Sequence, residues 1–221
     1  MPMNETQYRH WMCEIGRRLH TRGFVAAADG NISVRVDENR FLCTPSGMSK
    51  GYMRPDDMVV ADGKGNKIAG EKAVTSEFYT HLAAYEERPD IRVVIHAHPT
   101  YATVLTLMDI DTARPVLPEL IMTLVALPRA PYATPGSAEG ADAIRTLITT
   151  FDAVLLDRHG AIVVGADLQE AYMKMERVES AAHALYLAHA VGNPAPLSED
   201  KVAKLMAATV PPGTPAPPYP F

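Results

Sequence analysis

Two histidines separated by one residue, His96 and His98, end a short run rich in β-branched residues (91–98). In an extended strand alternate side chains share a face, so the two imidazoles project the same way, with Cα atoms roughly 6.5 Å apart. An isolated His-x-His is about as often an ordinary polar strand end as a metal site, although histidine is the commonest metal ligand. A second apolar run, residues 153–156, leads to His159. Three histidines at strand ends indicate an open metal site whose fourth position is free for a reactant.

Three short loops rich in small polar residues lie between the predicted elements. They offer hydroxyl groups, an amide and backbone N–H groups, and they contain Gly30, Asn31, Ser46, Gly47, Thr75 and Ser76. The last pair begins a predicted helix, whose N-terminus adds the positive end of a dipole, a common way to hold a phosphate without lysine or arginine. Each loop alone is more often a simple turn or cap. Neither a P-loop nor a G-x-G-x-x-G motif is present, so a nucleotide is not indicated.

The composition limits the class of protein. The 221 residues are 47% hydrophobic, which predicts a globular chain with a substantial core. Because the formal net charge is −5 and there is no basic cluster, we expect no nucleic-acid partner. Cys13 and Cys43 lack a paired spacing, which favours a reduced, intracellular chain. The N-terminus has no secretory pattern and no apolar stretch approaches about 18 residues, so we expect a cytoplasmic protein without a membrane partner.

Hydrophobic periodicity and turn residues predict a chain that mixes helices and strands. Apolar residues at three- and four-residue steps predict helices over 6–19, 75–85, 99–108, 138–150 and 168–190, with Ser76 as the N-cap of the second helix. Runs of β-branched and aromatic residues predict strands over 29–36, 41–44, 58–61, 67–69, 91–98 and 120–127, and on either side of His159. No repeat or long polar linker divides the chain, so residues 1–209 are expected to form one α/β domain. Residues 210–221 hold six prolines, which predicts an extended or loose tail.

Five motifs in a fixed order carry a resemblance to a known family. They are Gly30-Asn-Ile-Ser, Thr44-Pro-Ser-Gly, Thr75-Ser-Glu, His96-Ala-His and Arg158-His-Gly. Over roughly residues 5–190 the chain resembles the class II aldolase/adducin family, and within it the fuculose-1-phosphate-type aldolases. The resemblance implies a three-layer α/β/α domain around a central, largely antiparallel mixed sheet. It also implies a C4 homotetramer with active sites between subunits.

The resemblance further implies a role for each motif. His96, His98 and His159 would bind one divalent metal per subunit, usually Zn²⁺, although Mn²⁺, Co²⁺ or Fe²⁺ would also suit these nitrogens. The small-polar loops match the family's phosphate loops, and Glu77 matches its acid/base residue, whereas glutamate in the first turn of a helix would otherwise need no special explanation.

The activity implied by the resemblance is a class II, metal-dependent aldehyde-lyase reaction. A deoxyketose 1-phosphate would be cleaved reversibly to dihydroxyacetone phosphate and a small aldehyde, through an enediolate that the metal stabilises. Relatives include sugar-acid phosphate decarboxylases and pentulose-phosphate 4-epimerases, and both stay alternatives. The glutamate at position 77 favours an aldolase over an epimerase, which has aspartate there. A cupin barrel and a non-catalytic adducin-like protein are further alternatives. The long helix and the absence of glutamate from residues 99–108 argue against the first, and the histidines with Glu77 argue against the second.

One departure from the family pattern concerns the proton donor to the aldehyde. Fuculose-phosphate aldolases carry a tyrosine in the segment that aligns with residues 115–121, where this chain has none, and Glu119 stands near that position. Tyr132 matches a family motif, and aromatic residues of the tail, Tyr219 and Phe221, could close a neighbouring subunit's site. His81, within the predicted 75–85 helix, is expected to be an ordinary helix residue.

Overall fold

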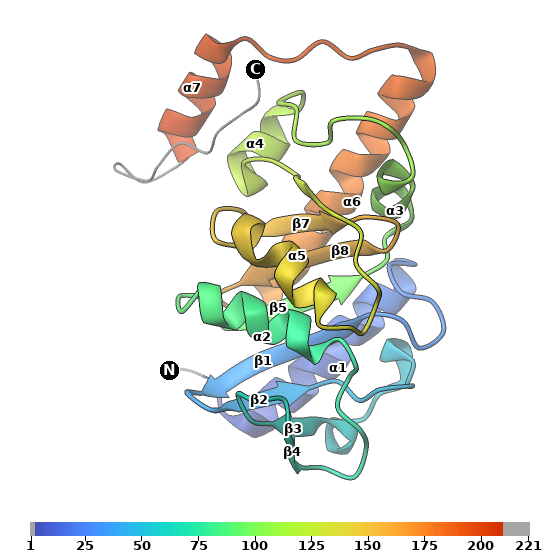
Figure 1. The fold of residues 1–221 in the computed structure, drawn as a ribbon, viewed down its shortest axis with the longest axis vertical. Helices are drawn as coiled ribbons and strands as arrows, with labels where there is room; N and C mark the ends of the chain where they lie inside the picture. The colour runs from blue at the N-terminus through green and yellow to red at the C-terminus, as the bar shows by residue number, and fades with distance from the viewer. Residues whose placement is uncertain (1–2, 210–221) are drawn as a thin grey trace.

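A computed structural model describes residues 3–209. Its centre is one eight-stranded sheet with the strand order β4-β3-β2-β1-β5-β8-β7-β6 (Figure 1). Every neighbouring pair is antiparallel except β6 and β7. The strands are β1 Asn31–Asp37, β2 Arg40–Cys43, β3 Val59–Ala61, β4 Lys67–Ala69, β5 Val93–Ala97, β6 Arg129–Ala130, β7 Ala153–Leu156 and β8 Gly160–Gly165. The predicted mixed, largely antiparallel sheet is therefore confirmed.

Helices cover both faces of this sheet. They are α1 Glu5–Thr21, α2 Phe78–Glu87, α3 Thr100–Thr106, α4 Pro118–Leu124, α5 Glu139–Ile148, α6 Leu168–Val191 and α7 Glu199–Thr209, with short 3-10 turns at Lys50–Tyr52 and Pro55–Asp57. In Figure 1, α2 and α5 lie in front of the sheet, while α1 and α6 lie behind it. None of the helices in the described part of the chain has the length and apolar character needed to cross a membrane.

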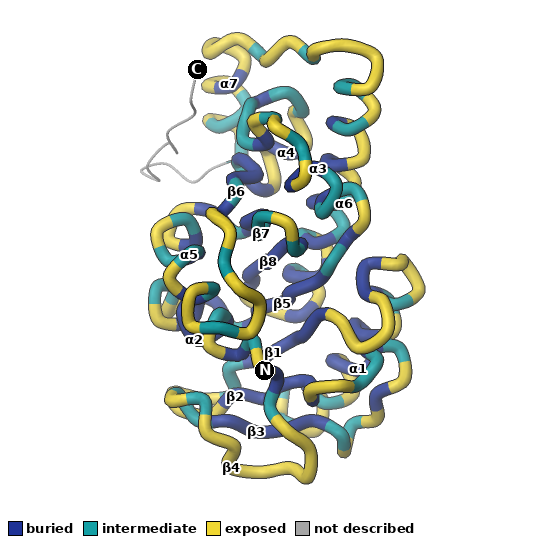
Figure 2. Tube along the Cα trace, turned by 45° about the vertical axis from the view of Figure 1, so that its right-hand side comes forward, coloured by how far each residue is buried: buried dark blue, intermediate teal, exposed yellow. Residues whose placement is uncertain are grey.

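Each face of the sheet has its own hydrophobic core, because successive side chains of a strand point to opposite faces. On β5, Val94 packs in the core beneath α2 and α5, whereas Val93 and Ile95 pack in the core shared with α1 and α6. Figure 2 shows these central strands as an almost continuous buried layer. The predicted single three-layer α/β/α domain is confirmed.

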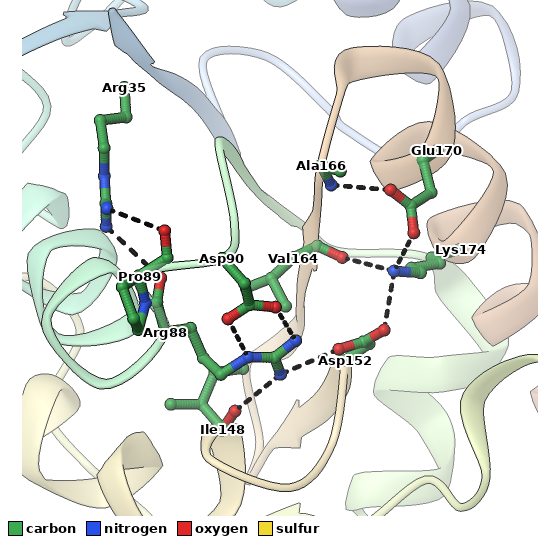
Figure 3. Close-up of polar contacts among 10 residues, drawn as sticks. All are labelled: Arg35, Arg88, Pro89, Asp90, Ile148, Asp152, Val164, Ala166, Glu170 and Lys174. Atoms are coloured by element: carbon green, nitrogen blue, oxygen red, sulfur yellow. Dashed lines mark hydrogen bonds and ion pairs between the residues drawn. The ribbon is translucent and has the colours of Figure 1, made fainter. Parts of the chain in front are cut away.

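Salt bridges tie the two helical layers together at one end of the sheet (Figure 3). Arg88, which follows α2, pairs with Asp90 at 2.8 Å and with Asp152 at 3.0 Å. Asp152 also accepts from Lys174 of α6 at 2.7 Å, and Lys174 pairs with Glu170 at 2.6 Å. Asp152 lies just before β7, so a side chain at the start of this strand is bonded to a segment on each face of the sheet.

One predicted strand is wrong. Residues 120–127 were predicted as a buried strand, but Pro118–Leu124 is α4. Pro118 is the first residue of the helix and Glu119 lies in its first turn, as is typical of a helix start. These helix-start signals outweigh the strand preference of the β-branched residues in the run. Helix α7 lies beyond the last predicted element, and the predicted tail 210–221 lies outside the described residues.

Candidate metal and phosphate site

The three predicted histidines meet in space. One ring nitrogen from each of His96, His98 and His159 lies within 4.8 Å of the others. The Nε2 atoms of His96 and His98 are 2.9 Å apart. His96 lies on β5 and His98 directly follows this strand, while the tight turn from β7 to β8 brings His159 beside them.

Backbone geometry fixes this arrangement. A Cβ on Gly160 would lie 2.4 Å from the carbonyl oxygen of Ala97, so only glycine lets the His159 turn approach the end of β5 this closely. Arg158, the other neighbour of His159, adopts a φ of 56°, a left-handed conformation that non-glycine residues adopt at an energetic cost. The backbone of this turn therefore has a local energetic cost, which the surrounding fold offsets while it keeps His159 beside the other two histidines.

The surroundings of His96 and His159 favour their neutral forms. His96 Nδ1 lies 3.0 Å from the carbonyl oxygen of Ala161, which can only accept, so Nδ1 carries the proton and Nε2 offers its lone pair. Burial lowers the pKa of His96 well below its usual value, and the neighbouring His98 and His159 lower it further. Burial likewise lowers the pKa of His159. Three imidazoles with converging nitrogens fit a divalent transition metal with one open position.

Glu77 completes the cluster on the α2 side. Its Oε2 accepts a hydrogen bond from Asn31 Nδ2 at 2.8 Å and lies 3.3 Å from His96 Nε2. Its Oε1 lies 3.4 Å from His159 Nε2. The helix begins at Phe78, so Glu77 rather than Ser76 holds the N-cap position, and the predicted Ser76 cap is wrong. The Glu77 side chain caps nothing because it turns toward the histidines.

All six predicted phosphate-loop residues border one cleft, with an empty volume of about 590 Å³. The cleft is lined by Gly30, Asn31, Ser46, Gly47, Thr75 and Ser76, together with Glu77, His98 and His159. Ser46 donates its backbone N–H to the carbonyl of Ala73 at 3.0 Å, which joins the second loop to the segment that leads into α2. The structure thus brings the predicted residues together, and their binding of phosphate stays a prediction.

Two charged residues of this cleft were not predicted. Asp29 Oδ2 lies 3.5 Å from His98 Nδ1, a position suited to orienting that imidazole. Lys50 is buried, and burial lowers its pKa to about 8, although the carboxylates of Asp29 and Glu77 partly offset this. The sequence gives little sign of either residue, because aspartate before a glycine is common in turns and lysine is usually exposed.

His81 is more than the ordinary helix residue that was predicted. It is fully buried, and its Nδ1 lies 2.7 Å from Ser33 Oγ, which lies 2.9 Å from Tyr85 Oη. Tyr85 donates to the carbonyl of Arg92 at 3.3 Å, so Ser33 donates to Tyr85 and His81 Nδ1 donates to Ser33. Burial and the neighbouring His96 lower the pKa of His81 to about 3. This neutral ring also lines a second cleft that shares Glu77, His96 and His159 with the cluster.

The candidate proton donors lie elsewhere in this chain. Glu119 is exposed in the first turn of α4, and Tyr132 is 62% exposed. Neither lines the two clefts beside the histidines. Tyr219 and Phe221 lie outside the described residues.

The fold and the cluster agree with the comparisons to known proteins. The model of the class II aldolase and adducin N-terminal domain matches residues 10–186, and the chain therefore belongs to the class II aldolase/adducin family. An open sheet with helices on both faces also excludes a cupin barrel. The relatives themselves differ in activity.

Two curated relatives represent two reactions. A 3-oxo-tetronate 4-phosphate decarboxylase of Haemophilus influenzae is 34% identical, and the alignment covers 81% of this chain and 87% of the relative. An L-fuculose phosphate aldolase of Methanococcus maripaludis is also 34% identical, covering 79% and 93%. Among solved structures, YgbL from Klebsiella pneumoniae superposes with a TM-score of 0.84 at 31% identity over 92% of this chain and all of its own. An L-fuculose 1-phosphate aldolase gives 0.84 at 30% identity over 90% and 94%.

Proposed function

We propose that this chain is a metal-dependent lyase that cleaves a ketose 1-phosphate by a reversible aldol reaction, giving dihydroxyacetone phosphate and a small aldehyde. The observation that carries the proposal is the position of Glu77, whose two carboxylate oxygens face His96 and His159 on the border of the cleft that contains the small-polar loops. A substrate bound there would have an acid/base group beside the carbon–carbon bond to be broken. The loops would hold the phosphate of the same substrate.

The chemistry divides among these residues. When bound to His96, His98 and His159, a divalent metal supplies Lewis-acid stabilisation of negative charge on the substrate. The small-polar loops hold the phosphate and so orient the ketose. Glu77 takes the proton from the substrate hydroxyl that becomes the aldehyde carbonyl, or returns a proton to the enediolate carbon after the bond has broken. Asn31 holds this carboxylate in place through its 2.8 Å hydrogen bond.

The test is product analysis with a panel of ketose 1-phosphates and the metal-loaded protein. The proposal predicts equal amounts of dihydroxyacetone phosphate and aldehyde, and condensation of the two in the reverse direction. Ser76→Ala should weaken a phosphorylated ketose by about 1–3 kcal/mol, the cost of removing a hydrogen bond to a charged group. It should barely change turnover of the unphosphorylated sugar. Because Ser76 is not the helix cap, loss of a cap does not complicate this comparison.

Decarboxylation of a 3-keto acid phosphate is the second candidate, supported by an observation of its own. Within residues 3–209, no tyrosine lines either cleft beside the histidines. Loss of carbon dioxide breaks the bond without any proton transfer at a substrate hydroxyl, so Glu77 alone could serve the reaction by protonating the enediolate. Carbon dioxide released without aldehyde would establish this candidate and remove aldol cleavage. If the protein instead inverts C4 of a pentulose phosphate and releases no cleavage product, it is an epimerase.

Three further features belong to this proposal. The metal is Zn²⁺, with Mn²⁺, Co²⁺ or Fe²⁺ as alternatives, and metal analysis of the purified protein tests this. The protein is a homotetramer in the cytoplasm, which light scattering and fractionation test. Residues 1–209 form the catalytic domain, so a chain truncated after residue 209 tests whether the tail is needed for folding or turnover.

A further inference from the structure

Lys50 is an unusual member of the cleft wall. It is 2% exposed and is among the largest fully buried side chains of the protein. Its Nζ donates to the carbonyl oxygen of Ala28 at 2.8 Å and to that of Met48 at 2.6 Å. Among residues 3–209, no ion pair joins this ammonium to a carboxylate. An ammonium has three N–H donors, so the two carbonyls leave one of them for another group.

A buried cation without an ion pair is costly to keep, since the charge loses its hydration. The two carbonyls that it contacts belong to the loops before Asn31 and after Gly47, both of which border the cleft. If its role were only to join these loops, hydrogen bonding would be enough, and a charge would only add to the cost. A charge is useful there if an anion shares the cleft.

The charges of the cleft point to the same conclusion. Asp29 and Glu77 also line it, and both carboxylates lie near enough to raise the pKa of Lys50 against the effect of burial. A phosphate entering the cleft meets these two negative groups. Within residues 3–209, Lys50 is the only lysine or arginine that lines the cleft, so it is the side chain that can offset their repulsion, beside the neutral donors of the loops.

We propose that Lys50 is the cationic residue of the phosphate subsite, where its charge attracts the phosphate of the substrate while its two hydrogen bonds hold the loops in place. This inference rests on the proposed function and deepens it, because it makes the substrate an anion at this end of the cleft. It also revises the expectation that the loops hold phosphate without lysine or arginine.

Inorganic phosphate is the probe, titrated calorimetrically into the metal-loaded protein. Lys50→Met removes the charge and the donors, whereas Lys50→Gln removes the charge and keeps an N–H donor for the carbonyls. Lys67→Met is the matched control, because Lys67 is exposed on β4 and its loss changes the net charge equally. We expect both Lys50 variants to bind phosphate at least tenfold more weakly, with unchanged metal content, and the control to bind like the wild type. Without phosphate, Lys50→Met should be as stable as the wild type or more stable.

The outcomes separate this inference from the proposed function. If Lys50→Gln binds phosphate like the wild type while Ser46→Ala binds it weakly, the phosphate cleft stands and Lys50 only joins the loops. Loss of stability in Lys50→Met without any change in phosphate affinity would mean the same. If the wild type itself shows no affinity for phosphate, both the inference and the phosphorylated substrate fail.

Discussion

Glu77→Gln is the substitution that best separates chemistry from structure at this site. Glutamine has the size of glutamate, and its Oε1 can still accept the hydrogen bond from Asn31. The side chain caps no helix, so the free energy of unfolding should change by about 1 kcal/mol or less, the difference between a charged and a neutral acceptor. The variant cannot exchange a proton as a base, so kcat should fall by about 10²–10⁴. That factor corresponds to about 3–5 kcal/mol of transition-state stabilisation.

Three measurements on the same preparation test this reasoning. Metal content and the midpoint of urea unfolding should match the wild type, while kcat falls and KM changes little. Glu86→Gln makes the same exchange at the other end of α2, where Glu86 pairs with Arg145 at 2.7 Å, and it should leave kcat unchanged. Unchanged turnover in Glu77→Gln would refute the acid/base role and leave Glu77 as a residue that happens to begin a helix. Loss of metal together with activity would instead make it a ligand.

Three other perturbations test the remaining parts of the site. His159→Ala should lose metal and activity together, because a three-ligand site has no spare ligand, and stoichiometric metal in this variant would contradict the assignment. Gly160→Ala should cost about 1–3 kcal/mol of stability and weaken metal binding, since its Cβ would lie 2.4 Å from the carbonyl oxygen of Ala97; denaturant unfolding and metal titration measure both. Burial lowers the pKa of Lys50 to about 8 from 10.5, so the folded state favours its neutral form, and the burial penalty is relieved as pH rises from about 8 to 10.5. Relative to Lys50→Met, the phosphate-free wild type should gain up to about 3 kcal/mol of stability over that window, and a flat difference would show that Lys50 is not buried as a cation.

The metal cluster was predictable because its geometry follows from local rules. His96 and His98 lie two residues apart at the end of β5, and the alternation of a strand alone puts them on one face. His159 followed from the same type of signal, an apolar run that ends in a histidine. The order of the motifs supplied the family, and with it the three layers that no periodicity could have given. The strand alternation could not show that β5 and β8 are neighbours in the sheet, which brings His159 beside the other two histidines.

The errors have physical causes. Leu120, Ile121 and Leu124 are buried at helical spacing, but every other residue of the 120–127 run except Thr123 is also apolar, so its period was hard to read. The predicted helix start at Ser76 followed from the ordinary preference of serine for the N-cap position. In the structure Glu77 holds this position instead, with its side chain turned toward Asn31 and the histidines. The place of Lys50 in the cleft could not be predicted, because lysine is seldom buried. Its burial depends on the contact between two loops, which no local sequence pattern shows.

The support behind Glu77 shows why such a site needs the whole fold. Glu77 is the N-cap residue of α2, and this helix presents His81 and Tyr85 to Ser33 on β1, so a chain of hydrogen bonds fixes the helix against the sheet one turn after the glutamate. The carbonyl of Arg92, on the segment that leads into β5, ends this chain and sets its direction. The helix that follows Glu77 is therefore bonded to β1, which begins with Asn31, and to the segment that leads into β5, which carries His96. Since no short-range pattern links residues 33, 81 and 92, the sequence could indicate the acid/base group but not what holds it within reach of the metal ligands.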